Sequence, residues 1–122
     1  MKLAISASGP ALSDVVDERF GRAAYFVIVD PSTMEHEAID NSVNRNALQG
    51  AGIAAAELVA ERKAGAVLTG QLGPKAFQAL QAASIPAYAA AGMTAADAVA
   101  AFKSGSLERL SEAGESRRGG NG

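Results

Sequence analysis

Cysteine is missing from the 122-residue sequence, and histidine occurs once, at His36. Without cysteine the chain can form no disulfide, use no thiolate nucleophile and hold no zinc or iron–sulfur centre through thiolates. One histidine and no Gly-x-Ser-x-Gly motif also make Ser–His hydrolase chemistry a poor prediction. Any metal must therefore be held in another way.

Long apolar runs and an excess of basic residues are also missing. No run approaches the roughly 20 apolar residues that span a bilayer, and the first six residues predict a strand and no secretory signal. Lys and Arg number 11 against 13 Asp and Glu, a formal net charge of −2, so no basic field attracts nucleic acid. We expect a cytoplasmic protein with neither nucleic acid nor membrane as a partner.

The apolar pattern is typical of one α/β domain. Short β-branched or aromatic runs predict strands, small apolar residues at helical spacing predict helices, and Gly65 is expected to end the first helix. The order β-β-β-α-β-α-β-α predicts a mixed five-stranded sheet with the first strand central. The predicted strands cover residues 2–7, 25–30, 35–40, 66–68 and 85–88, and the helices cover 52–63, begin at Pro74, and begin at the capping box 94–97 and stop at Gly105.

The chain divides at about residue 110. Residues 1–110 form the predicted domain, whereas 111–122 have no apolar periodicity and predict a flexible C-terminal tail. The pair Arg117 and Arg118 leaves a second interpretation open, in which the tail is an anion-seeking arm.

Several loops are predicted to meet at one rim of the sheet. In open α/β sheets, ligands bind at the carboxyl ends of the strands, where the topology switches direction. The strand ends of residues 2–7, 66–68 and 85–88 share that rim. A ligand site is therefore predicted among the loops 6–24, 41–50, 69–74 and 89–92.

The stretch TGQLGPK, residues 69–75, suits an anion. Gly70 and Gly73 permit close backbone approach, Pro74 fits a first helical turn, and the free N–H groups of that turn favour negative charge. The Gly-Lys-Ser/Thr of a Walker loop is missing. Helix capping alone and capping combined with anion contact both stay open.

The stretch GAGIAA, residues 50–55, imitates a dinucleotide fingerprint. No strand runs directly into it, and no acid about 20 residues later is placed to hold a ribose, so NAD binding is not expected. The glycines more readily pack the helix start against the sheet, with the first-turn amides turned to the same rim.

The segment DERFGRAA, residues 17–24, brings two arginines to the rim. The guanidinium groups of Arg19 and Arg22 offer fixed forks of donors for an oxyanion or a sulfide-rich anion. The alternative is that they form surface ion pairs with Asp14, Asp17 and Glu18.

Four segments in this order resemble the dinitrogenase iron–molybdenum cofactor biosynthesis family, which includes NifX, the C-terminal domain of NifB and the orange protein. They are KLAISASG, DERFGRAAYFVIVD, GAGIAAAELV and VLTGQLGPKAFQAL, and the resemblance spans residues 1–110. It implies a ribonuclease H-like three-layer fold. It also implies a non-catalytic carrier or scaffold for a preassembled anionic metal–sulfur cluster, either molybdenum–copper sulfide or iron–molybdenum cofactor or its precursor.

Such a cluster brings its own sulfides, so a thiol-free cradle of donors suffices. The arginines are the expected charge partners, amides the anion donors, and Phe20 or Met93 an apolar wall. His36 is a weak metal candidate, since an exposed edge strand accounts for it equally well. The predicted binding set is Ser8, Arg19, Phe20, Arg22, Gly50, Gly52, Ile53, Gly70, Gln71, Leu72, Gly73, Lys75 and Met93.

Partners are expected to be a cluster donor or acceptor protein. Two alternatives come from other classes: a regulatory protein–protein interaction module without a cluster, and an enzyme acting on a small phosphorylated metabolite. No general base is visible for the enzyme, so we expect a protein without catalytic residues.

Overall fold

The computed structural model describes residues 1–111, so all but the first residue of the predicted tail lies outside the described part. Within 1–111 every helix is too short or too polar to cross a bilayer. The described elements, in chain order, are β1 Lys2–Ala7, β2 Tyr25–Val29, β3 His36–Asp40, α1 Ser42–Arg45, α2 Ala51–Glu61, β4 Ala64–Thr69, α3 Pro74–Ala82, β5 Ala87–Ala89 and α4 Ala95–Lys103.

The strands form one mixed sheet in the order β3-β2-β1-β4-β5, which confirms the predicted five-stranded sheet with the first strand at its centre. β1, β4 and β5 run parallel, while β2 and β3 are antiparallel to their neighbours. The carboxyl ends of β1, β4 and β5 therefore meet at one rim, as the sequence predicted.

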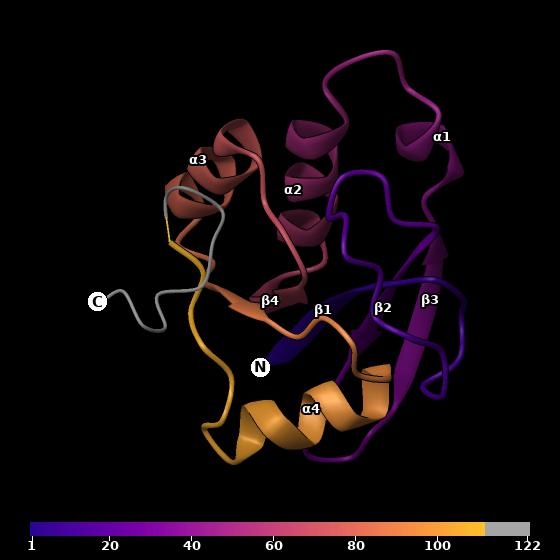
Figure 1. Ribbon diagram of the computed structural model, residues 1–122, viewed down its shortest axis with the longest axis vertical. Coiled ribbons are helices and arrows are strands. Elements are labelled where there is room, and N and C mark those ends of the chain that lie inside the picture. The colour runs from indigo at the N-terminus through magenta and orange to yellow at the C-terminus, as the bar shows by residue number, and fades with distance from the viewer. Residues whose placement is uncertain (112–122) are drawn as a thin grey trace.

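Helices cover both faces of this sheet. Figure 1 shows α2 and α3 on one face and α4 on the other. Alternation along β1 explains the layering: Ala4 packs into the cluster with α2 and α3, whereas Leu3 and Ile5 pack into the cluster with α4. Central strands buried on both faces read as continuous apolar runs, as β2 does.

The first long helix ends earlier than predicted. α2 stops at Glu61, Lys63 takes the left-handed conformation with φ of 61°, and its N–H donates to the carbonyl of Ala60 at 2.9 Å. Gly65 lies inside β4, so its prediction as the helix terminator was wrong. A lysine closes the helix at a position where glycine would be expected.

Two further boundaries differ from expectation. β5 begins at Ala87, because Pro86 has no N–H for the ladder and contributes only its carbonyl, which accepts the N–H of Val67 at 2.9 Å. The predicted loop 41–50 contains the one-turn helix α1, which buries no residue. A helix without an apolar face gives no periodic signal in the sequence.

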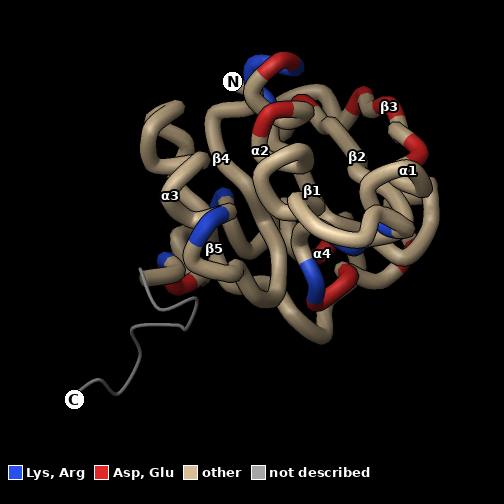
Figure 2. Tube along the Cα trace, turned by 90° about the horizontal axis from the view of Figure 1, so that it is seen from above, with Lys and Arg blue, Asp and Glu red and all other residues tan. Residues whose placement is uncertain are grey.

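The predicted edge strand is correct. β3 pairs only with β2 in the described sheet, and most of its residues are exposed. Figure 2 shows acidic positions along it. Charged residues at an exposed edge discourage pairing with another chain.

Candidate functional site

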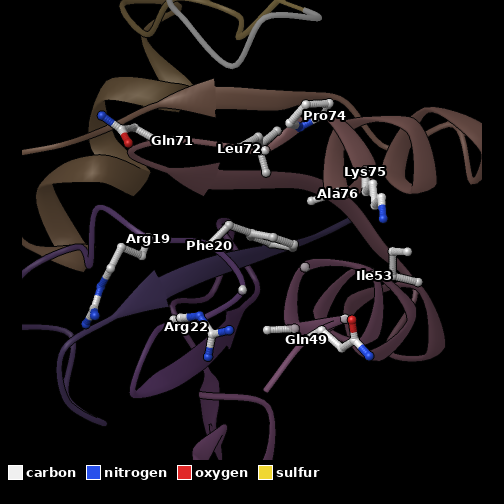
Figure 3. Close-up of a pocket in the computed structure, with 15 residues that line it drawn as sticks. Arg19, Phe20, Arg22, Gln49, Ile53, Gln71, Leu72, Pro74, Lys75 and Ala76 are labelled. Carbon is white, nitrogen blue, oxygen red and sulfur yellow. The ribbon is translucent and has the colours of Figure 1, made fainter. Parts of the chain in front are cut away.

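A cavity of about 790 Å³ opens where the loop after β1 meets the first turns of α2 and α3 (Figure 3). It lies at the rim predicted from the strand order. Its walls come from three short segments that are far apart in the sequence: Arg19, Phe20, Gly21 and Arg22; Gln49, Gly50, Ala51, Gly52 and Ile53; and Gln71, Leu72, Gly73, Pro74, Lys75 and Ala76.

Hydrogen bonds of two buried hydroxyl groups hold the loop after β1, which contains Arg19 and Arg22, against the sheet. The hydroxyl of Ser6, at the end of β1, donates to the carbonyl of Asp17 at 2.7 Å. The same oxygen lies 2.7 Å from the hydroxyl of Thr69, at the end of β4, and both side chains are fully buried. Since Ser6 has only one hydroxyl proton, Thr69 must donate to it. Two strand ends and the loop are thus joined by one hydrogen-bonded chain.

Two glycines let backbones approach where any side chain would collide. A Cβ on Gly70 would lie 2.5 Å from Cα of Glu18, and one on Gly21 would lie 2.7 Å from the amide nitrogen of Gly52. Beside Gly70, the N–H of Gln71 donates to the carbonyl of Glu18 at 2.7 Å. Close approach at these points brings the loop against both helix starts.

Both helices enter the cavity without a side-chain cap. Gly50 is the N-cap of α2 in the left-handed conformation, with φ of 80°, and Gly73 is the extended N-cap of α3. Neither first turn contains an acid, and the first-turn amides of α2 have no bonded acceptor in residues 1–111. Free amides at two helix starts give the cavity a concentration of partial positive charge.

Three cationic side chains line the same cavity. Lys75 is exposed in the first turn of α3. Arg22 donates through Nη1 to the carbonyls of Arg45 and Ala47. Arg19 is paired with Asp17, with Nε 3.3 Å from Oδ1. One arginine therefore forms the surface ion pair that the sequence left open, and the other does not.

The floor is apolar and well packed. Phe20 is 2% exposed and packs edge-on against Phe26, with ring centroids 5.2 Å apart. Leu72 is also buried, whereas Ile53 is 39% exposed at the mouth. Apolar walls with a few fixed donors are typical of ligand sites, and the volume lies within the usual range of about 300–1,000 Å³.

The lining residues include no carboxylate, histidine or cysteine. Across residues 1–111, no three His, Cys, Asp or Glu side chains come together as a metal site. Hard and borderline cations need such ligands, so this donor set suits an anion and does not suit a bare metal ion.

The structure brings most of the predicted set together at this cavity. Three residues of that set lie elsewhere. Ser8 is in the exposed turn after β1, and Gly70 contacts Glu18 beneath the loop. Met93 packs in the cluster under α4, on the opposite face of the sheet, so of the two proposed apolar walls only Phe20 lines the cavity.

His36 is at the far end of the sheet. It pairs with Val29, which in turn pairs with Leu3 at the start of β1. Its ring is exposed, and Nδ1 lies 3.3 Å from the carbonyl of Met34. In the described chain it belongs to no group of three His, Cys, Asp or Glu side chains that could hold a metal ion.

Five lining residues were not part of the predicted binding set. Gly21, Ala51, Pro74 and Ala76 are the sequence neighbours of predicted residues, and that adjacency alone could have added them. Gln49 had a weaker signal, because it belongs to a predicted rim loop and precedes a glycine that was chosen. An isolated glutamine has no pattern that marks it as part of a site.

Several known proteins are similar to this chain in sequence, and two of them are solved structures that are also similar in fold. The apo form of the orange protein from Desulfovibrio gigas is 47% identical, with a TM-score of 0.87 over 90% of this chain and 92% of that one. A candidate NifB protein from Thermotoga, assigned to the DUF35 family, is 31% identical, with a TM-score of 0.80 over 97% of this chain and 98% of that one. An uncharacterized protein of Methanocaldococcus jannaschii is 30% identical over 113 residues, 90% of this chain and 92% of its own length.

The family model described as dinitrogenase iron-molybdenum cofactor matches residues 1–105, which include every strand, every helix and every lining residue of the cavity described above. The chain therefore belongs to the dinitrogenase iron–molybdenum cofactor family.

Proposed function

We propose that this protein carries a preassembled anionic metal–sulfur cluster in the cavity between the starts of α2 and α3. The observation that supports this most directly is the donor set: two uncapped helix starts and unpaired cationic groups around an apolar floor, with no carboxylate. The cluster is cargo in this proposal, and the protein takes part in no chemical step.

The residues present fit such a cargo. A cluster of this kind has bridging and terminal sulfides and a net negative charge, so it needs hydrogen-bond donors and cations and no thiolate ligand. The polarizable sulfides also suit the apolar surface of Phe20 and Leu72. Either a molybdenum–copper sulfide or iron–molybdenum cofactor or its precursor satisfies these requirements, and the family resemblance supports both.

Each group has a separate task in this proposal. The amides of Ala51, Gly52 and Ile53 bind sulfide along one side, and the first-turn amides of α3 bind along the other. Arg22 and Lys75 supply full charges, while the buried ring of Phe20 excludes water from below. All of these contacts are non-covalent, so the cluster can be passed to an acceptor protein without breaking a metal–protein bond.

Reconstitution tests the proposal. The purified protein is incubated with tetrathiomolybdate and a copper salt, desalted, and analysed for both metals and for visible absorption. A stoichiometric, coloured complex is expected, and its stability should fall at high ionic strength because the contacts are electrostatic. A colourless, metal-free protein after desalting would refute it. The Thr94→Ala variant, altered on the opposite face, should load as the wild type does.

A second candidate is a regulatory module that binds a protein partner and no cluster. Its specific support is the segment before α2, where Leu48 is fully exposed and Val43 is 85% exposed. Exposed apolar residues beside a cavity are a feature of protein contact sites. If partner binding were identical with and without the cluster, and unaffected by charge reversal at Arg22, this candidate would replace the first.

The finer statements made from the sequence and from the resemblance stay predictions. They are the ribonuclease H-like description of the fold, the absence of catalysis, the identity of the metals, a donor or acceptor protein as partner, and a cytoplasmic location. Metal analysis of protein isolated from its native cells, without reconstitution, would test the metal identity directly.

A further inference from the structure

Arg19 and Arg22 lie in the same loop but are held differently. Arg19 is bound to the carboxylate of Asp17, through Nε at 3.3 Å and Nη2 at 3.4 Å, and its side chain is 57% exposed. In Figure 3 its guanidinium points away from Phe20 and the helix starts. Its charge is thus already neutralised, outside the centre of the cavity.

Arg22 is anchored by neutral groups. Its Nη1 donates to the carbonyls of Arg45 and Ala47, both at 2.8 Å, which uses both protons of that nitrogen. Carbonyl oxygens fix the orientation of the guanidinium without cancelling its charge. Figure 3 shows the group below Phe20 and to the left of Gln49, on the same side of the view as the start of α2.

The other edge of this guanidinium is available. Nε and Nη2 have no bonded acceptor among residues 1–111. Their N–H bonds are parallel and form the fork with which arginine binds two acceptor atoms of one anion. A lysine at this position could supply the charge but not the fork.

The anchoring also joins the cavity to a weakly held segment. Residues 42–49 contain α1, which buries no residue, and Leu48 within them is fully exposed. Polar contacts therefore hold this segment: the two bonds from Arg22 and those of Asn41, whose Nδ2 donates to the carbonyls of Gly21 and Ala23. A group that orders Arg22 also orders the carbonyls bound to it.

We infer that Arg22 is the residue that selects the cargo, and that it transmits occupancy of the cavity to residues 45–47. Nε and Nη2 bind two acceptor atoms on one edge of the anion, while Nη1 keeps its bonds to Arg45 and Ala47. Arg19 takes no part in recognition. This inference rests on the proposed function, because it names how that same cavity recognises a sulfide-rich anion.

Equilibrium dialysis with tetrathiomolybdate, followed by molybdenum analysis, tests the recognition step. Arg22→Lys keeps the charge and loses the fork, and should weaken binding by about tenfold, the usual cost of losing a charge-assisted hydrogen bond. Arg19→Lys is the matched control and should stay within about threefold of the wild type. Equal losses in both variants, or no loss in Arg22→Lys, would overturn the inference.

Amide hydrogen exchange tests the transmission step. In the wild type, bound tetrathiomolybdate should slow exchange at residues 45–47 by about twofold to fivefold, because linkage is reciprocal. The slowing should persist in Arg19→Lys and vanish in Arg22→Lys. Slowing that persists without the Arg22 fork would show that another contact transmits occupancy, and would overturn this part.

One measurement needs no variant and separates the two levels of the proposal. On addition of tetrathiomolybdate to the wild type, the Nε–H resonance of Arg22 should shift and that of Arg19 should not. A shift at Arg19 alone, or at neither with the anion bound, contradicts the inference and leaves the proposed function standing. If the anion does not bind the wild type at all, the proposed function fails first.

Discussion

The starts of α2 and α3 differ from the start of α4 in how their free amides are satisfied. At α4, the hydroxyl of Thr94 accepts the N–H of Asp97 at 3.1 Å, and Asp97 adds a negative charge to the first turn. The N–H groups of Ala95 and Ala96 donate to carbonyls of the loop after β1, both at 2.9 Å. The start of α4 is complete without a ligand.

At α2 and α3 no side chain caps the first-turn amides. Each has a glycine N-cap, no side-chain cap and no acid in its first turn, and the two starts face one cavity. A glycine N-cap costs a helix about 0.3 kcal/mol of stability relative to a good side-chain cap. The difference separates the two faces of one sheet: the start of α4 is satisfied by contacts within the fold, whereas the starts of α2 and α3 leave the donors that the proposed anion would use.

Adding a side-chain cap to one of the uncapped helix starts should have the largest effect on anion binding. A Cβ on Gly73 meets nothing within 4 Å, and φ of −72° suits any residue, so Gly73→Asp fits the N-cap of α3. The carboxylate should take the free amides and repel an anion, lowering the affinity for tetrathiomolybdate by about thirtyfold, while raising the free energy of unfolding by about 0.3 kcal/mol. Equilibrium dialysis and denaturant unfolding measure the two effects.

Gly73→Asn is the matched control for that variant. It offers a similar cap without the charge, so its affinity should lie between those of Gly73→Asp and the wild type. If both variants bound the anion as tightly as the wild type, the open start of α3 would have no part in binding.

The second largest effect is expected from a substitution that forces the loop around Gly21 away from the start of α2. A Cβ on Gly21 would lie 2.8 Å or less from the backbone N and Cα of Gly52, so Gly21→Ala must displace backbone. The free energy of unfolding should fall by about 1–3 kcal/mol, as in other overpacked sites, and anion affinity should fall with it. Urea unfolding measures the first effect. Gly73→Ala, with open space around its Cβ, should cost about half as much; an equal cost would contradict the close approach.

Removing the side-chain cap of α4 should lower the stability of the fold and leave anion binding unchanged. Thr94→Ala removes the cap of α4 and should lower the free energy of unfolding by about 1 kcal/mol, while Thr94→Ser should retain most of it. Anion binding should not change in either variant, because Thr94 lies away from the cavity lining. A loss of binding in Thr94→Ala would mean that the two faces are coupled and that the comparison is wrong.

The smallest expected effect is the loss, at low pH, of one stabilising hydrogen bond at the start of α1. The backbone N–H of Ser42 donates to Asp40 at 2.7 Å and holds the pKa of that carboxyl below its ordinary value of 3.8. Because the folded pKa is the lower one, the stabilising bond is fully present above pH 3.8 and is lost as the pH falls through the folded pKa. An NMR titration of the Asp40 carboxyl should therefore have its midpoint below 3.8. A midpoint at or above 3.8 would contradict the bond.

Much of the fold could be predicted, because its signals are local. The buried face of α4, at Ala95, Ala98 and Val99, and its cap at Thr94 follow from spacing and residue type. Where prediction was wrong, another contact replaced the local preference. Lys63 closes α2 in a conformation that favours glycine, and Pro86 moves the start of β5 by withholding an N–H.

The candidate site was predicted less completely, because proximity across the chain is not a local property. From the sequence alone, Met93 and Phe20 were equally good apolar candidates. In the structure, Met93 packs on the opposite face of the sheet and only Phe20 lines the cavity. Arg19 and Arg22 were equivalent in the sequence. The carboxylate of Asp17 and the carbonyls of residues 45 and 47 distinguish them.

The sequence by itself determined the succession of strands and helices along the chain, the thiol-free character of any site and the positions of the helix starts, since these depend on residue type and spacing. Only the tertiary structure decided which amides remain free, which arginine keeps its charge and which residues share the cavity. Those outcomes depend on contacts between residues that are far apart in the sequence. A donor that the composition counts as available is lost to a ligand when another group in the fold accepts its hydrogen bond.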